Sequence, residues 1–85
     1  MNTKDLRNKA RLLKATINVG KNGLTSGTLE EIKSQLKKHK LVKISLLPSF
    51  LEEHDRKEVA QQLAHKTDSF LIDQIGRIVV LFKEK

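Results

Sequence analysis

Apolar residues recur with helical spacing in three segments of the chain. In residues 4–14, "KDLRNKARLLK", Leu6, Ala10 and Leu13 follow one another at intervals of four and three, which places them on one face of a helix. A second helix is predicted over about residues 25–39, with Thr25, Ser26 or Thr28 as its cap. A third is predicted over residues 52–67, "EEHDRKEVAQQLAHKT". The apolar faces of these two helices are Leu29, Ile32 and Leu36, and Val59, Ala60, Leu63 and Ala64.

Four short segments rich in β-branched and apolar residues alternate with these helices. They are "ATINV" (15–19), "LVKISLL" (41–47, stopped by Pro48), "SFLIDQI" (69–75) and "IVVLF" (78–82). Only Gly76 and Arg77 separate the last two segments. A two-residue link that begins with glycine is typical of a type II′ hairpin.

The order of elements is therefore α-β-α-β-α-β-β. Strands separated by a helix predict parallel pairing with right-handed crossovers, and the closing hairpin adds one antiparallel strand. We expect an α/β two-layer fold in which helices back a four-stranded mixed sheet. With 85 residues, the chain is expected to form a single domain over residues 1–85.

Three glycines lie within eight positions between the first strand and the second helix, in "VGKNGLTSGTLEEI". A loop that feeds a helix N-terminus offers free backbone N–H groups to an anion. Gly20 and Gly23 leave room for close approach, and Lys21 and Asn22 add a charge and an amide at the tip. The spacing fits neither a Walker A loop nor a dinucleotide fingerprint. An ordinary tight turn has the same G-x-x-G pattern.

The charge distribution supports the anion interpretation. The net charge is +7; residues 1–43 hold eleven Lys and Arg against three Asp and Glu, and residues 44–85 hold six against seven. All of the positive excess thus lies in the half that carries the glycine loop, which indicates a polyanionic partner. In the first helix four cations fall within about one quadrant at ~100° per residue, and we call them the basic edge: Lys4, Arg7, Arg11 and Lys14.

Further cations have two interpretations each. Lys33 and Lys37, with Lys40 one turn on, could extend a nucleic-acid surface along the second helix or be ordinary solvated lysines. Arg77 could contact nucleic acid at the hairpin tip or serve only the solubility of the turn.

Several kinds of site are not expected. The chain has no cysteine, so disulfides and zinc ribbons are excluded. His39, His54 and His65 share no helical spacing and are expected on the surface, so we predict no metal, cofactor or catalytic residue. Phe70 and Phe82 lie in apolar strands and are expected in the core, which argues against an aromatic platform for bases. No apolar run is long enough to span a bilayer, and the N-terminus lacks the apolar segment of a secretory signal.

Three blocks of the sequence, "VGKNGLTSG", "LVKI" and "QIGRIVVLFK", resemble the CRM domain (chloroplast RNA splicing and ribosome maturation), especially the stand-alone YhbY-like proteins of bacteria and archaea. The resemblance covers nearly the whole chain and implies a fold similar to the C-terminal domain of translation initiation factor three. It implies RNA binding without catalysis: bacterial members associate with precursors of the large ribosomal subunit, and plant relatives assist group II intron splicing. Ser26 stands where many members carry an acidic residue. The family's RNA-contacting loop and basic helix map onto Gly20, Lys21, Asn22 and Gly23, and onto Arg7, Arg11 and Lys14.

The sequence therefore favours a non-catalytic protein that contacts the phosphate backbone of structured RNA, with ribosomal RNA or a precursor of the large ribosomal subunit as partner. We expect a cytoplasmic monomer that does not bind membranes. One alternative is a KH-like binder of single-stranded RNA, but such a domain places a helix before its G-x-x-G, whereas "ATINV" predicts a strand. A second is a small enzyme for a phosphate ligand. Such an enzyme needs a general base near the loop, and Asp5, Glu30 and Glu31 are the only acids in the first half.

Overall fold

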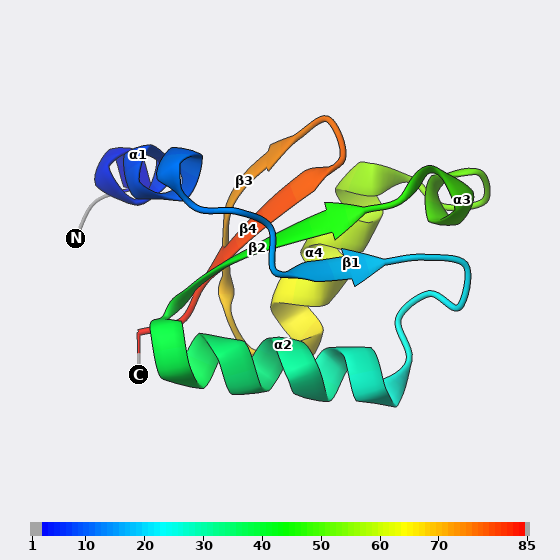
Figure 1. Ribbon diagram of the computed structural model, residues 1–85, viewed down its shortest axis with the longest axis horizontal. Coiled ribbons are helices and arrows are strands. Elements are labelled where there is room, and N and C mark those ends of the chain that lie inside the picture. Colours follow the sequence, from blue (N-terminus) through cyan, green and yellow to red (C-terminus); the bar gives the residue numbers. More distant parts are fainter. Residues whose placement is uncertain (1–2, 85) are drawn as a thin grey trace.

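The structure, a computed structural model, describes residues 3–84, and within them lie four helices and four strands (Figure 1). The predicted α/β class and the four-stranded mixed sheet are confirmed. The short helix α3 is an addition to the predicted order, and it begins at Pro48, which also ends the preceding strand. In chain order the elements are α1 (Thr3–Leu12), β1 (Ile17–Val19), α2 (Ser26–His39), β2 (Leu41–Leu46), α3 (Pro48–Leu51), α4 (Arg56–Lys66), β3 (Phe70–Ile75) and β4 (Ile78–Phe82).

The strands are arranged in the order β1-β2-β4-β3. β1 pairs with β2 in parallel, and β4 is antiparallel to both β2 and β3. Parallel pairing is thus confirmed for β1 and β2, but β2 and β3 do not pair directly. The hairpin explains the difference, because the wholly apolar β4 takes the central place. β3 carries Asp73 and Gln74 and forms the edge, where its register shifts between Leu71 and Asp73.

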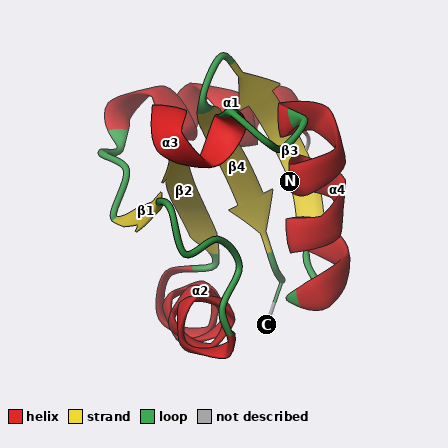
Figure 2. Ribbon diagram, turned by 90° about the vertical axis from the view of Figure 1, so that its right-hand side faces the viewer, coloured by secondary structure: helices red, strands yellow, loops and turns green. Residues whose placement is uncertain are grey.

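Two apolar clusters occupy opposite faces of the sheet, because successive strand residues point to opposite sides. Val79 and Leu81 of β4 face the larger cluster, which α2, α3 and α4 cover, whereas Val80 faces the smaller cluster, which α1 covers. Figure 2 shows the end of β4 lying between α2 and α4. The buried residues that α2, α3 and α4 contribute to the larger cluster are Ile32, Leu36, Phe50, Val59, Ala60 and Leu63.

Helix α1 is shorter than its pattern suggested. It ends at Leu12, so Lys14 lies outside the helix and Leu13 is 42% exposed instead of joining Leu6 and Ala10 in the core. A side chain from β2 fixes this end: the Lys43 ammonium donates hydrogen bonds to the carbonyl oxygens of Ala10 (3.2 Å) and Leu13 (3.1 Å). The chain leaves the helical path there to reach β1.

The other two long helices begin at side-chain caps. The backbone N–H of Thr28 donates to Thr25 Oγ1 (3.1 Å) at the start of α2, which selects Thr25 from the three candidate caps. Helix α4 begins at Arg56 rather than residue 52, because Asp55 caps it by accepting from the N–H of Glu58 (3.1 Å).

Candidate nucleic-acid interface

The Gly20–Gly23 loop is a tight turn at the carboxyl end of β1. The N–H of Gly23 donates to the carbonyl oxygen of Gly20 (2.9 Å), and Gly23 has φ +71°. Lys21 and Asn22 form the exposed tip. Their backbone N–H groups donate to no protein acceptor within residues 3–84. The loop thus presents two open amides and one ammonium close to the N-terminus of α2.

The two glycines also have a packing role against α3. A Cβ on Gly20 would lie 3.3 Å from Leu47 Cδ1, and one on Gly23 would lie 3.4 Å from Phe50 Cε1. The contact at Gly20 is tighter than most Cβ contacts. At Gly23 the contact is ordinary, but the backbone has a positive φ that residues with a side chain rarely adopt. The positive φ therefore favours glycine at position 23 whether or not a phosphate approaches the loop, whereas a side chain at position 20 would only have to displace the end of the exposed Leu47 side chain.

Acidic residues beside the loop were missed by the sequence reasoning. A hollow of about 340 Å³ is lined by Lys21, Phe50, His54 and two glutamates, Glu52 and Glu53. The rings of Phe50 and His54 stack with centroids 4.3 Å apart. A signal was available, since the carboxyl ends of parallel strands meet at one edge of a sheet. The segments that follow β1 and β2 are therefore neighbours.

The basic edge is divided in the structure. Lys4, Arg7 and Arg11 are exposed on α1, whereas Lys14 follows the helix. Arg7 is tied to β3: its Nε donates to the carbonyl oxygen of Ile72 (3.4 Å) and lies 3.8 Å from the Asp73 carboxylate. Arg11 makes no hydrogen bond or ion pair with the described part of the chain. Arg11 is therefore the more available of the two arginines for an outside anion.

The structure does not bring the basic edge and the Gly20–Gly23 loop together. Figure 1 places α1 and this loop, the pale-blue connection after β1, at opposite ends of the long axis. The separation follows from topology, because α1 leads into the start of β1 and the loop leaves its end. The two features are separate candidate contacts and do not form one site.

Arg77 lies at the same end of the sheet as the Gly20–Gly23 loop, but on the opposite side of β2. Gly76 has φ +56° and Arg77 is not among the residues with positive φ, as a type II′ turn requires. The Arg77 side chain is exposed, and its carbonyl oxygen accepts from the N–H of Leu46 (2.7 Å). This bond places the hairpin tip beside the end of β2, with the start of α3 between the tip and the loop.

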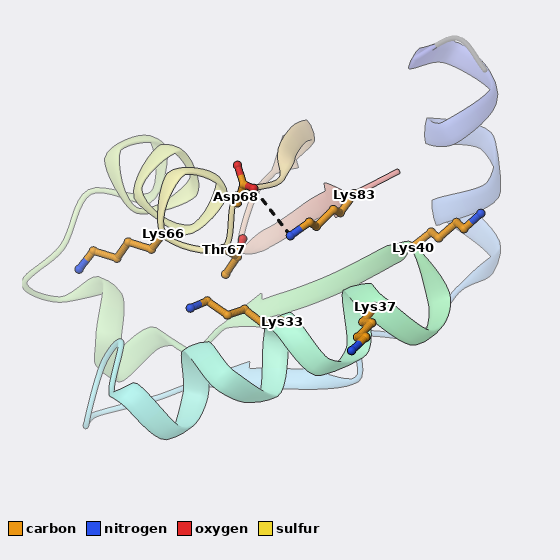
Figure 3. A pocket seen from close by; sticks show the side chains of 7 residues that line it. All are labelled: Lys33, Lys37, Lys40, Lys66, Thr67, Asp68 and Lys83. Carbon is orange, nitrogen blue, oxygen red and sulfur yellow. Dashed lines mark ion pairs between the residues drawn. The ribbon is translucent and has the colours of Figure 1, made fainter. Parts of the chain in front are cut away.

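Lys33 and Lys37 are exposed on α2, which begins beside the loop. They share a pocket of about 650 Å³ with three further lysines (Figure 3). Lys66 and Lys83 in this pocket were missed by the sequence reasoning, because they come from the ends of α4 and β4 and share no spacing with α2. We call the following five residues, together with Thr67 and Asp68, the lysine pocket: Lys33, Lys37, Lys40, Lys66 and Lys83.

The aromatic residues are only partly where they were expected. Phe82 is half-buried against the smaller cluster, but Phe70 is 68% exposed, so its predicted core position is wrong. Phe70 starts the edge strand β3 beyond the cover of α1. The three histidines are exposed, as predicted. No group of three or more potential ligands in residues 3–84 is placed to hold a metal, and no helix there is long and apolar enough to cross a bilayer.

Comparison with known proteins relates this geometry to a family. The model of the CRS1/YhbY (CRM) domain matches residues 1–83. The "Probable RNA-binding protein YqeI" of Bacillus subtilis is 35% identical over 79 residues, which cover 93% of this chain and 80% of that protein. The "Probable RNA-binding protein MJ0652" of Methanocaldococcus jannaschii is 31% identical over 80 residues, or 94% of this chain and 59% of the relative.

A solved structure agrees with the fold. The solution structure of the hypothetical protein SAV1595 from Staphylococcus aureus matches with a TM-score of 0.81 at 26% identity, covering 98% of this chain and 84% of that one. The family model and the YqeI alignment confirm the resemblance carried by the three sequence blocks. This chain therefore belongs to the CRS1/YhbY (CRM) domain family.

Proposed function

We propose that this protein binds structured RNA without catalysing a reaction, and that its partner is ribosomal RNA in a cytoplasmic precursor of the large ribosomal subunit. Relatives from a bacterium and an archaeon are both named probable RNA-binding proteins, which supports RNA as the partner. The observation that carries the proposal is the Gly20–Gly23 loop, which holds the exposed Lys21 and two backbone N–H groups without an acceptor in residues 3–84, close to a helix N-terminus.

The separation of the contacts sets a minimum size for the RNA partner. The loop and the basic edge lie at opposite ends of a molecule whose longest extent is 34 Å (Figure 1). A single nucleotide cannot touch both, whereas an RNA of several nucleotides can. Backbone amides and cations contact phosphates without reading bases, so we expect recognition of shape more than of sequence.

The KH-like alternative is disfavoured by the element before the loop. A KH domain places a helix there, and this chain places the strand β1 (Ile17–Val19) there instead. The expected preference is accordingly for structured RNA over a single strand.

One observation favours the enzyme alternative, because the structure brings His54, Glu52 and Glu53 into the same hollow as Lys21. All four side chains are exposed. A small-molecule site usually buries most of its ligand, so this open hollow is a weaker match to catalysis than to the edge of a macromolecular contact.

The test is a comparison of nucleic acids by fluorescence anisotropy. The probes are a stem-loop fragment of large-subunit ribosomal RNA, an unstructured RNA of equal length and a DNA duplex, each at 0.1 M and 0.3 M salt. We expect the stem-loop RNA to bind tightest and tagged protein to sediment with precursors of the large subunit. Tighter binding of the single strand would support the KH-like alternative, and no binding to any RNA at 0.1 M salt would overturn the proposal.

A further inference from the structure

The lysine pocket draws its cations from three separate parts of the chain. Lys33, Lys37 and Lys40 follow one side of α2, Lys66 ends α4, and Lys83 follows β4. Figure 3 shows that these side chains extend in different directions from α2, from the end of α4 and from the residue after β4, and that Lys83 forms an ion pair with Asp68 (3.8 Å). At about 650 Å³ the pocket is in the size range of ligand-binding clefts.

Backbone hydrogen bonds hold the walls of the pocket. The N–H of Lys83 donates to the carbonyl oxygen of Lys40 (2.8 Å), which joins the end of α2 to the end of β4. Helix α4 ends in a Schellman motif, in which Asp68 (φ +53°) donates to His65 (3.2 Å) and Ser69 donates to Ala64 (2.8 Å). The points from which the lysines extend are therefore set by the backbone, although the side chains themselves are long.

Within the described residues, the pocket's charges are poorly compensated. Lys83 pairs with Asp68 and Lys33 pairs with Glu30, both at 3.8 Å. The ammonium groups of Lys37, Lys40 and Lys66 have no hydrogen bond or ion pair in residues 3–84. Two helix C-termini add about half a negative charge each. Five cations against two carboxylates and two such termini leave about two positive charges in excess.

Helix dipoles explain only part of this cluster. Lysines in the last turn of a helix stabilise it, and this accounts for Lys37, Lys40 and Lys66 near the ends of α2 and α4. It does not account for Lys33, which lies in the middle of α2, or for Lys83, which lies beyond β4. Like charges gathered by three elements repel one another unless an anion neutralises them.

We propose that the lysine pocket is a second phosphate-binding region for the RNA that meets the Gly20–Gly23 loop. This rests on the proposed function. Helix α2 begins beside the loop and ends at the pocket, so one RNA backbone can follow its length from the loop amides to the lysines (Figure 1). The excess charge and the ammonium groups without a partner in residues 3–84 suit a chain of phosphates.

Removal of cations is the first test, with the large-subunit stem-loop RNA as probe. The Lys66→Gln/Lys83→Gln variant is compared with Lys38→Gln/Lys57→Gln, which loses the same charge from exposed lysines outside the pocket. We expect the pocket variant to bind about five- to tenfold more weakly at low salt, and the control about twofold. The slope of log K against log salt should become shallower by about one to two contacts in the pocket variant only.

Removal of an acid is the converse test. Asp68→Asn removes the carboxylate of the pocket, and asparagine tolerates the left-handed backbone of this position as aspartate does. Glu58→Gln is the control, because it removes an exposed acid from the first turn of α4, outside the lysine pocket. Both variants gain one positive charge, but we expect only Asp68→Asn to bind the RNA about two- to threefold more tightly.

The outcomes separate this inference from the function on which it rests. If both double variants bind the RNA equally well, or if Asp68→Asn and Glu58→Gln behave alike, the pocket is a solvated surface and the RNA-binding function stands. If the unmodified protein does not bind the RNA, both proposals fail. Circular dichroism confirms that each variant is folded before binding is compared.

Discussion

The backbone N–H of Leu47 donates a 2.8 Å hydrogen bond to the carbonyl oxygen of Val19. It joins the residue just before the Gly20–Gly23 loop to the residue just before α3. The loop is consequently positioned against α3 on one side and joined to α2 on the other. The shape of the loop is set before any ligand arrives. Binding of a phosphate chain would therefore cost less conformational entropy, because the loop does not have to be ordered.

Substitution of Gly23 should separate the geometry of the loop from its charge. Gly23→Val places a branched side chain at φ +71° and 3.4 Å from the Phe50 ring, so we expect a loss of about 1 kcal/mol or more of stability. For a domain of this size that lowers the melting temperature by roughly 4–8 °C per kcal/mol. Lys21→Gln should leave stability unchanged and weaken RNA binding by about 0.5–1 kcal/mol at low salt.

The comparison is made at 0.3 M salt and at a temperature where both variants are folded. Screening reduces the contribution of Lys21 there, so Gly23→Val should be the weaker RNA binder. Wild-type affinity in the folded Gly23 variant would mean that the glycines serve only the turn and its packing against α3.

The negative charge of the hollow beside the loop should oppose RNA binding, and this can be measured. Glu53→Gln removes an exposed carboxylate that lines the hollow with Lys21. If phosphates cross this loop, the change should strengthen RNA binding about twofold at low salt and have no effect at 0.5 M salt. The matched control is Glu58→Gln, which removes an exposed acid of α4 that lines neither this hollow nor the lysine pocket. Equal effects of the two variants would indicate a general charge effect and no phosphate at the loop.

The basic edge is tested best through Arg11. Arg7→Gln also breaks the contacts with Ile72 and Asp73, so any loss of binding would be mixed with a structural effect. Arg11→Gln should make the salt slope shallower by about 0.7–0.9, the value for one phosphate contact. Lys9→Gln is the control, because at ~100° per residue Lys9 faces away from the basic edge. An Arg11 variant with the wild-type slope would show that this edge is solvated.

A prediction about stability concerns Lys43, which ties α1 to the sheet. Lys43→Met keeps the aliphatic stem and removes the ammonium that donates to Ala10 and Leu13. Because these charged hydrogen bonds are partly exposed, we expect a loss of about 1 kcal/mol in the free energy of unfolding, measured with urea. Lys38→Met, which removes an exposed lysine whose side chain makes no hydrogen bond within residues 3–84, should change it by less than about 0.5 kcal/mol. Equal values for the two variants would contradict a capping role.

The sequence predicts this fold well where periodicity is the controlling signal. The range of β4 is predicted to the residue, and Thr25 is among the predicted caps of α2. Errors occur where a pattern continues past the physical end of its element. Leu13 continues the apolar spacing of α1, but the chain must turn there to reach β1. Phe70 continues the apolar run of β3, but the pattern of apolar and polar residues along the strand does not reveal that β3 lies at the edge of the sheet.

The candidate site is less predictable, because it depends on which ends of the elements meet. Glu52 and Glu53 lie beside the loop only because β1 and β2 are parallel neighbours. Lys66 and Lys83 join the lysines of α2 only because α2 and α4 cover one face of the sheet and β4 ends between them (Figure 2). The spacing of residues along the sequence does not predict these contacts between distant elements.

The placement of β4 in the centre of the sheet also affects how copies of the chain meet at high concentration. The exposed edges of the sheet are left to β1, which has three residues, and to β3, whose register shifts near its middle. A strand from a second molecule needs a long and regular row of free backbone groups to pair with, and neither edge offers one. The exposed Phe70 and Ile75 on β3 can therefore remain in contact with water with little risk that the sheets of two molecules join edge to edge and aggregate.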